Sequence, residues 1–282
     1  MKRFSVFGML FRTVLALVMI AALMACGKKS DSTNSDASTA PTLPPYASLA
    51  MDFSSFPSST TAAPALTSAL STTFGWSNFT YSYVNVAVWN AIITVGLAVP
   101  VLTFAESFNH TPVLQSDGSW LWSYTKTVSD VLYTAKLYGK LSGSQVTWKM
   151  YISKAGDYTD FNWFNGTADL TTTSGSWTMY ESPANPVELL SINWDRTSAT
   201  TGNITYTNVK AGDANNGGYI SYGNSGSTDP AYGAYYTIYN ISAGDLINIE
   251  WNTASKDGRV KSPTAFGDSN WHYWDSLLQD VP

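Results

Sequence analysis

The sequence predicts a mainly β fold: an antiparallel meander forming a strongly curved sheet or incomplete barrel, with an apolar helical segment packed in or over it. Three observations predict this. From residue 119 onward large and small side chains alternate with a period of two, turn signals separate these runs, and a long uncharged segment precedes them. A β-sandwich is the alternative, because open sheets of about ten strands tend to curl or split.

The composition of the 282-residue chain excludes several classes of function. Hydrophobic residues make up 44% and aromatic residues 14%, which indicates a substantial core and not a disordered chain. The net charge of −5 argues against a nucleic-acid partner, because no basic surface is available to neutralise phosphates. One Cys and two His exclude a disulfide framework and make a thiolate or multi-His metal site improbable. We therefore expect no cofactor.

The N-terminus has the features of a secretory signal over residues 1–25. Lys2 and Arg3 give a positive start, residues 14–24 form a short apolar run, and Cys26 follows small residues. The stretch Leu23-Met24-Ala25-Cys26-Gly27 resembles the lipobox of bacterial lipoproteins. The resemblance implies that the chain is cut before Cys26 and that Cys26 carries lipids such as palmitate. Gly27 in place of Asp implies the outer membrane.

The lipobox resemblance predicts a protein of the cell envelope whose membrane partner is reached through its lipid. Residues 26–50 are rich in Ser, Thr, Asp and Pro, which predicts a flexible lipidated tether. We expect residues 51–282 to form a single mainly β domain with an N-terminal helical region at about 60–108. Loss of the three basic residues of the signal lowers the net charge to about −8.

The apolar segment at 83–105 carries no charged residue. Its polar residues do not gather on one helical face, so we expect a helix buried on all sides and broken at Pro100. A membrane span and a strand are the alternatives, because the length suffices for the first and the Val and Ile content suits the second.

The strands expected between 119 and 262 each carry Trp or Tyr on one face and small polar residues on the other. Examples are Trp122, Trp148, Trp177 and Trp251. This pattern indicates a sheet with one wet face and an aromatic face that must be covered. The architecture is similar to that of the lipoprotein carrier and lipocalin-like families, although no diagnostic motif of either is present. That likeness is architectural and does not by itself establish a function.

No arrangement of residues singles out a catalytic site. His110 and His272 are the two imidazoles, and Gly267-Asp268-Ser269 lies too close to the end of the chain to match an esterase block. The carboxylates fall in separate turns and strands, so no pair suited to glycoside hydrolysis stands out. We predict that the protein is not an enzyme.

The aromatic residues expected to be exposed are the candidate ligand contacts. Trp271, Tyr273 and Trp274 cluster near the C-terminus, and Trp120 and Trp122 share one strand. The leading hypothesis is a non-enzymatic envelope lipoprotein that binds a hydrophobic or amphipathic ligand or an envelope protein partner. The alternatives are a structural or interaction scaffold with a filled core, and a surface lipoprotein that binds a glycan.

Overall fold

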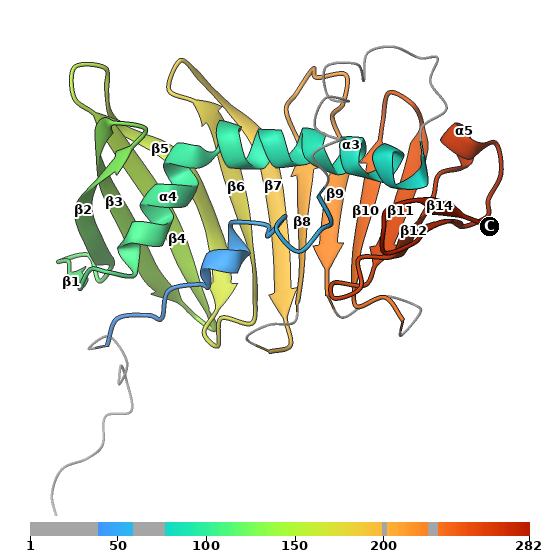
Figure 1. The fold of residues 1–282 in the computed structure, drawn as a ribbon. Coiled ribbons are helices and arrows are strands. Elements are labelled where there is room, and N and C mark those ends of the chain that lie inside the picture. Colours follow the sequence, from blue (N-terminus) through green and yellow to red (C-terminus); the bar gives the residue numbers. More distant parts are fainter. Residues whose placement is uncertain (1–38, 59–76, 199–201, 225–230) are drawn as a thin grey trace, which may run out of the picture. The chain divides into compact units, whose positions relative to one another are not determined.

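Fourteen strands form one antiparallel sheet in which each strand pairs with the next strand along the chain (Figure 1). The computed structural model describes residues 39–58, 77–198, 202–224 and 231–282, and Ala40–Pro282 form one compact unit. The sheet is not closed into a barrel, since β1 and β14 do not pair. The predicted mainly β meander with a helical segment is thus confirmed. The β-sandwich alternative is wrong, because the described strands belong to one sheet.

The strands have lengths from two to twelve residues. In chain order they are β1 (Val113–Leu114), β2 (Trp120–Val128), β3 (Val131–Ser142), β4 (Gln145–Lys154), β5 (Tyr158–Asp169), β6 (Ser174–Ser182), β7 (Asn185–Arg196), β8 (Gly202–Asn208), β9 (Tyr219–Gly223), β10 (Ala234–Asn240), β11 (Asp245–Trp251), β12 (Gly258–Lys261), β13 (His272–Trp274) and β14 (Asp280–Val281). The short edge strands limit the backbone that each end of the sheet leaves unpaired.

The sheet has an aromatic inner face and a polar outer face. On β4, Val146, Trp148, Met150 and Ile152 are buried, and the residues between them are half-buried or exposed. The same alternation recurs on the neighbouring strands and continues across the sheet. Each buried aromatic ring removes about 150–250 Å² from water. The inner face is therefore the largest apolar surface that the fold has to cover.

Two layers of chain cover the inner face. The helical elements are η2 (Tyr46–Ser48), α3 (Asn78–Ala91), η3 (Ile92–Gly96), α4 (Ala98–Ser107) and α5 (Pro263–Phe266). Figure 1 shows α3 and α4 lying across the sheet, with η2 and its neighbouring residues beside them. Ser77 caps the N-terminus of α3, because its side chain accepts a hydrogen bond from the Thr80 N–H.

The helices are attached to both ends of the sheet. At the start of α3, the Asn78 side chain donates to the carbonyl of Tyr273 on β13 at 2.8 Å. At the far end, the Tyr124 hydroxyl on β2 donates to the carbonyl of Thr103 at 2.7 Å. The helical cover thus connects β13 with β2, which lie near opposite ends of the strand order.

The helical segment differs from the prediction in two ways. Its 63° bend falls between Thr94 and Ala98 instead of at Pro100. Pro100 lies in the first turn of α4, where its missing N–H removes no hydrogen bond within the helix. The expected burial on all sides is also wrong, because Val88 and Leu102 remain 50% and 40% exposed.

The described helices were also compared with the requirements of a membrane span. None of them alone is long and apolar enough to cross a membrane. The pair Asn78–Thr94 and Ala98–Ser107 meets the requirements of length and composition only when taken together across its bend.

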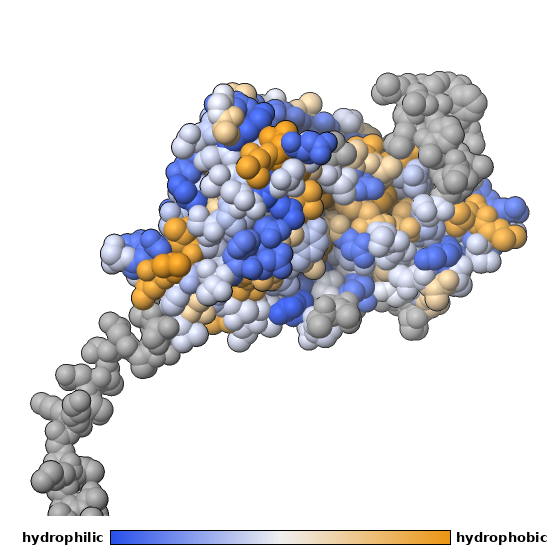
Figure 2. All heavy atoms as spheres, turned by 60° about the vertical axis from the view of Figure 1, so that its left-hand side comes forward, coloured by the Kyte–Doolittle hydropathy of each residue, from blue (hydrophilic) through white to orange (hydrophobic). Residues whose placement is uncertain are grey.

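Exposed apolar side chains also occur at the β1 end of the sheet. Phe108, Val113, Leu114 and Leu132 are each more than 40% exposed. Figure 2, turned so that this end comes forward, shows orange apolar patches separated by blue hydrophilic residues. The exposed apolar surface in this view is therefore divided and not continuous.

Residues 40–58, which we call the strap, cross the inner face as a second covering layer. Leu49, Met51 and Phe56 are buried, and the Tyr206 hydroxyl donates to the Leu49 carbonyl at 2.8 Å while accepting from the Met51 N–H at 3.0 Å. The predicted boundary of the tether at residue 50 is therefore wrong, because residues 40–50 pack in the folded unit. Residues 1–38 and 59–76 lie outside the described residues, as do the predicted signal and the start of the predicted helical region.

Indole rings on the inner face lie over glycines of the neighbouring strand. Gly139 pairs with Trp148, Gly166 with Trp177, Gly175 with Trp194, and Gly258 with Trp274. A Cβ atom added at any of these glycines would come within 2.2–2.8 Å of the indole. The missing side chains are what allow the wide rings to lie flat on the sheet.

Replacing one of these glycines is expected to destabilise the fold. In Gly166→Ala the new Cβ would lie 2.0 Å from the Ser176 carbonyl oxygen and 2.6 Å from the Trp177 ring. We expect a loss of at least about 2 kcal/mol in the free energy of unfolding, measured by urea denaturation. Gly233→Ala is the control, because a Cβ there meets nothing within 4 Å. Equal stability of the two variants would show that the ring does not rest on Gly166.

A pair of tyrosines tests the attachment of the strap. Tyr206→Phe leaves the Leu49 carbonyl and the Met51 N–H buried without their partner, which is expected to cost about 1–3 kcal/mol. Tyr236 is equally buried, but its hydroxyl has no partner within the described residues. Tyr236→Phe should therefore be neutral or stabilising. Amide hydrogen exchange at Met51 should accelerate in Tyr206→Phe and stay unchanged in Tyr236→Phe; the reverse order would disprove this attachment.

Candidate functional site

Two of the five predicted ligand contacts lie in the core. Trp122 is 3% exposed, and its ring packs 5.6 Å from that of Trp148. Trp274 is 1% exposed, and its indole N–H donates to the Lys256 carbonyl at 2.9 Å. The expectation that Trp122 and Trp274 are exposed is wrong. Both belong to the aromatic inner face, which helices and strap cover.

The other three predicted contacts are partly exposed but do not form one surface. Trp120 packs against the margin of the core on β2, whereas Tyr273 lies on β13 at the other end of the strand order. The Arg259 guanidinium carbon lies 4.3 Å from the centroid of the Trp271 ring, and the Lys261 ammonium lies 5.2 Å from it. The proposed lipidation site at Cys26 lies outside the described residues.

The two histidines have local partners. His110 lies 3.3 Å from Glu106 and stacks on Tyr124, and His272 lies 3.1 Å from Asp268 and stacks on Phe266. Within the described ranges, no three His, Cys, Asp or Glu side chains come together in a way that could hold a metal ion. These histidines are thus accounted for by hydrogen bonds and ring packing.

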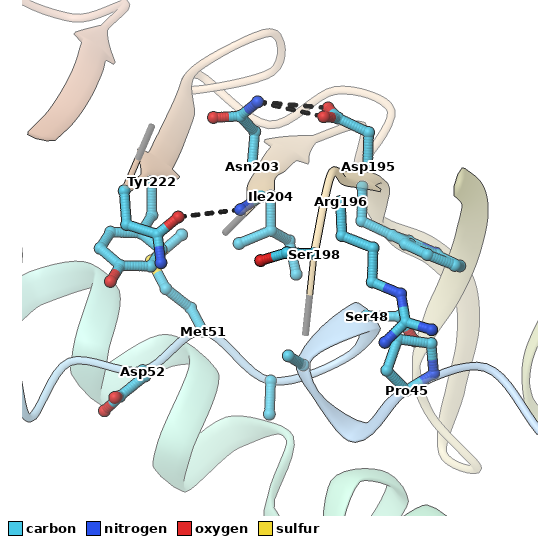
Figure 3. A pocket seen from close by; sticks show the side chains of 15 residues that line it. Pro45, Ser48, Met51, Asp52, Asp195, Arg196, Ser198, Asn203, Ile204 and Tyr222 are labelled. Atoms are coloured by element: carbon cyan, nitrogen blue, oxygen red, sulfur yellow. Dashed lines mark hydrogen bonds between the residues drawn. The ribbon is translucent and has the colours of Figure 1, made fainter. Parts of the chain in front are cut away.

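One pocket lies between the strap and the ends of β7 and β8. It has a volume of about 210 Å³. Figure 3 shows Met51 on the strap side and Asp195 paired with Asn203 on the strand side, where the Asn203 amide donates to the carboxylate at 3.1 Å. The Arg196 guanidinium is held by the carbonyl and hydroxyl of Thr172. The pocket is smaller than the roughly 300–1,000 Å³ of typical ligand sites, and these polar groups already have partners.

A larger groove lies between the helices and the sheet. We call it the helix groove; its volume is about 400 Å³. The lining residues come from α3 and η3, from β7, β8 and β10, and from the loops after β8 and β10. They are Asn85, Val88, Trp89, Ile92, Leu189, Leu190, Asn208, Asp213, Asn215, Gly218, Ile238, Tyr239, Asn240, Ile241 and Ser242.

The helix groove combines an apolar wall with a polar rim. Val88, Trp89 and Ile92 supply the helix side, and Leu190 and Ile238 supply the strand side. Polar side chains come from α3, from the ends of β8 and β10, and from the loops that follow these strands. Among them, Asp213 accepts hydrogen bonds from the Asn215 N–H at 2.7 Å and the Asn208 amide at 3.4 Å. This arrangement is suited to a ligand with an apolar part and a polar end.

The charge of the helix groove restricts the polar end of such a ligand. Asp213 is the single charged residue among those that line the groove, and no Lys or Arg lines it. Lys210, nearby in the same loop, forms an ion pair with Glu181 at 2.9 Å. The groove therefore lacks a cation for a carboxylate or phosphate head group. Neutral or cationic polar ends fit it better.

Sequence reasoning missed the helix groove because it expected the segment 83–105 to be buried on all sides. Val88, Trp89 and Ile92 were read as core residues of the apolar segment. The spacing of Val88 and Ile92, four residues apart, does indicate one helical face, but it does not show which face is covered. Comparison with protein-family models, curated proteins and solved structures found no match to this chain.

Proposed function

We propose that the protein is a non-enzymatic, lipid-anchored protein of the cell envelope that binds a small amphipathic ligand in the helix groove. The observation that carries the proposal is the apolar wall of α3, η3, β7 and β10 beside a polar rim with one carboxylate. The ligand has an apolar tail and a neutral or cationic polar end. Cys26 carries the anchor, on the strength of the lipobox resemblance.

The size of the groove limits the ligand and its affinity. A volume of about 400 Å³ holds a short tail rather than a complete phospholipid. Each buried methylene contributes about 0.8 kcal/mol, so a tail of about eight carbons gives roughly 6 kcal/mol before the costs of association. Affinity in the micromolar range or weaker follows.

The covered inner face makes a structural scaffold the second candidate. Helices and strap occupy the surface that a carrier with an open concavity leaves to its ligand. A scaffold needs no small ligand, so absence of binding in the helix groove would favour this candidate.

A matched pair of helix variants tests the groove. Val88 lines it, whereas Leu102 is a similarly exposed aliphatic residue of α4 that does not. We expect Val88→Glu to weaken binding of the neutral dye N-phenyl-1-naphthylamine at least about tenfold, because the apolar rings of the dye would meet a charge. Leu102→Glu should bind as the wild type does. Fluorescence titration of the full chain carrying Cys26→Ser measures this without detergent, and equal loss in both variants would reject the site.

The charge of the polar end gives an independent prediction. We expect monododecanoyl glycerol to displace the dye at about tenfold lower concentration than dodecanoate does, since the groove holds Asp213 and no cation. Asp213→Asn should narrow this difference. Competition titrations with the two compounds below their critical micelle concentrations provide the measurement. Stronger displacement by dodecanoate would contradict the proposed ligand class.

A further inference from the structure

The outer face of β3 and β4 carries alternating lysines and tyrosines. The register places Lys136 opposite Tyr151 and Tyr138 opposite Lys149. Lys140 follows Tyr138 on the same face, two residues along β3. The rings of Tyr138 and Tyr151 pack edge to face, with centroids 5.9 Å apart. Two tyrosine rings thus lie among three ammonium groups on one surface.

A groove of about 490 Å³ runs over these residues. Asp117 and Asp160 also line it, together with the lysines and tyrosines. It lies on the opposite face of the sheet from the helix groove, and its volume is within the range of ligand sites. This surface is independent of the proposed function.

Charge within this outer groove is unevenly compensated. Lys136 forms an ion pair with Asp160 at 2.8 Å, and Lys140 lies 3.8 Å from Asp117. The ammonium of Lys136 holds the pKa of Asp160 below its usual value, so the carboxylate stays charged. Lys149 is exposed and has no acidic partner within the described residues. The groove therefore has a net positive charge in a chain whose net charge is −5.

We propose that this outer groove binds an acidic saccharide. The apolar face of a pyranose ring packs on Tyr138 or Tyr151, and a carboxylate of the sugar pairs with the ammonium of Lys149. The paired carboxylates of Asp117 and Asp160 accept hydrogen bonds from sugar hydroxyls. A uronic acid presents an apolar ring face, a carboxylate and hydroxyl groups. The groove offers a partner for each of them: a tyrosine ring, an ammonium group and carboxylate acceptors.

The alternatives among anionic ligands fit the groove less well. A nucleic-acid backbone requires a run of uncompensated cations, whereas two of the three lysines here have acidic partners. A simple inorganic anion needs no aromatic rings. Two tyrosine rings lie beside a single lysine without an acidic partner in the described residues. This combination favours a sugar with few charges and an extended apolar face.

Calorimetric titration with uronate oligosaccharides tests the proposal. The probes are tetrasaccharides of galacturonate, mannuronate and guluronate, with the galactose tetrasaccharide as the neutral comparison and sodium phosphate as the simple anion. We expect at least one uronate to bind with a Kd below about 1 mM and to weaken severalfold at 0.5 M NaCl. No binding by any uronate, or equal binding of the neutral sugar or of phosphate, would overturn the proposal.

Single substitutions locate the binding. Lys149→Gln should weaken uronate binding at least about fivefold, and Tyr138→Leu should do the same without altering the salt dependence. Lys154→Gln is the control, because Lys154 lies on the same strand but pairs with Asp157 outside the groove. Thermal unfolding of each variant confirms that the sheet is intact. Unchanged binding in Lys149→Gln would place the sugar elsewhere and reject the proposed site.

Discussion

The close contact between indole rings and glycines is the constraint on which the rest of this structure depends. Four tryptophans of the inner face lie over glycines of adjoining strands, in positions that no side chain could share. The rings can lie flat only because these cross-strand neighbours have no Cβ. The result is a broad, flat aromatic surface that extends from β3 to β13.

The covering layers follow from this surface. Buried indole N–H groups and tyrosine hydroxyls need hydrogen-bond partners. The helices and the strap supply many of these partners. Trp177 donates to the Ser48 hydroxyl, and Trp251 donates to the Ser55 carbonyl. The strap is irregular chain that leaves carbonyls free to accept these bonds, which a regular helix would not. Among the described residues, space for ligands lies beside the cover and on the outer face.

Much of the fold could be predicted from the sequence, because alternation with a period of two is a local signal. Trp122 and Trp148 were placed on one aromatic face for this reason, and both are found there. The same observation argued against Trp122 as a ligand contact, since the aromatic face is the one that must be covered. Residues 40–50 of the strap were predicted to belong to the tether, because Ser, Thr, Asp and Pro are frequent in residues 26–50. Their burial depends on Tyr206 and Trp177, more than one hundred residues away.

The sites could not be predicted, because each depends on register or on tertiary packing. The pairing of Tyr138 with Lys149 is set by the alignment of β3 with β4, which no local pattern reveals. The helix groove lies between α3, β7 and β10, so it depends on how these distant segments pack together.

The helical cover also has a mechanical consequence. A meander whose strands pair only with their neighbours is an open strip, and its curvature is free to vary. Here α3, η3 and α4 link the two ends of the sheet. Asn78 forms a hydrogen bond with β13, and Thr103 forms one with β2. A helix is stiff along its axis, so the span between these two anchors is fixed except at the bend in η3. That single joint sets how far the two ends of the strip stand apart, and it borders the helix groove through Ile92.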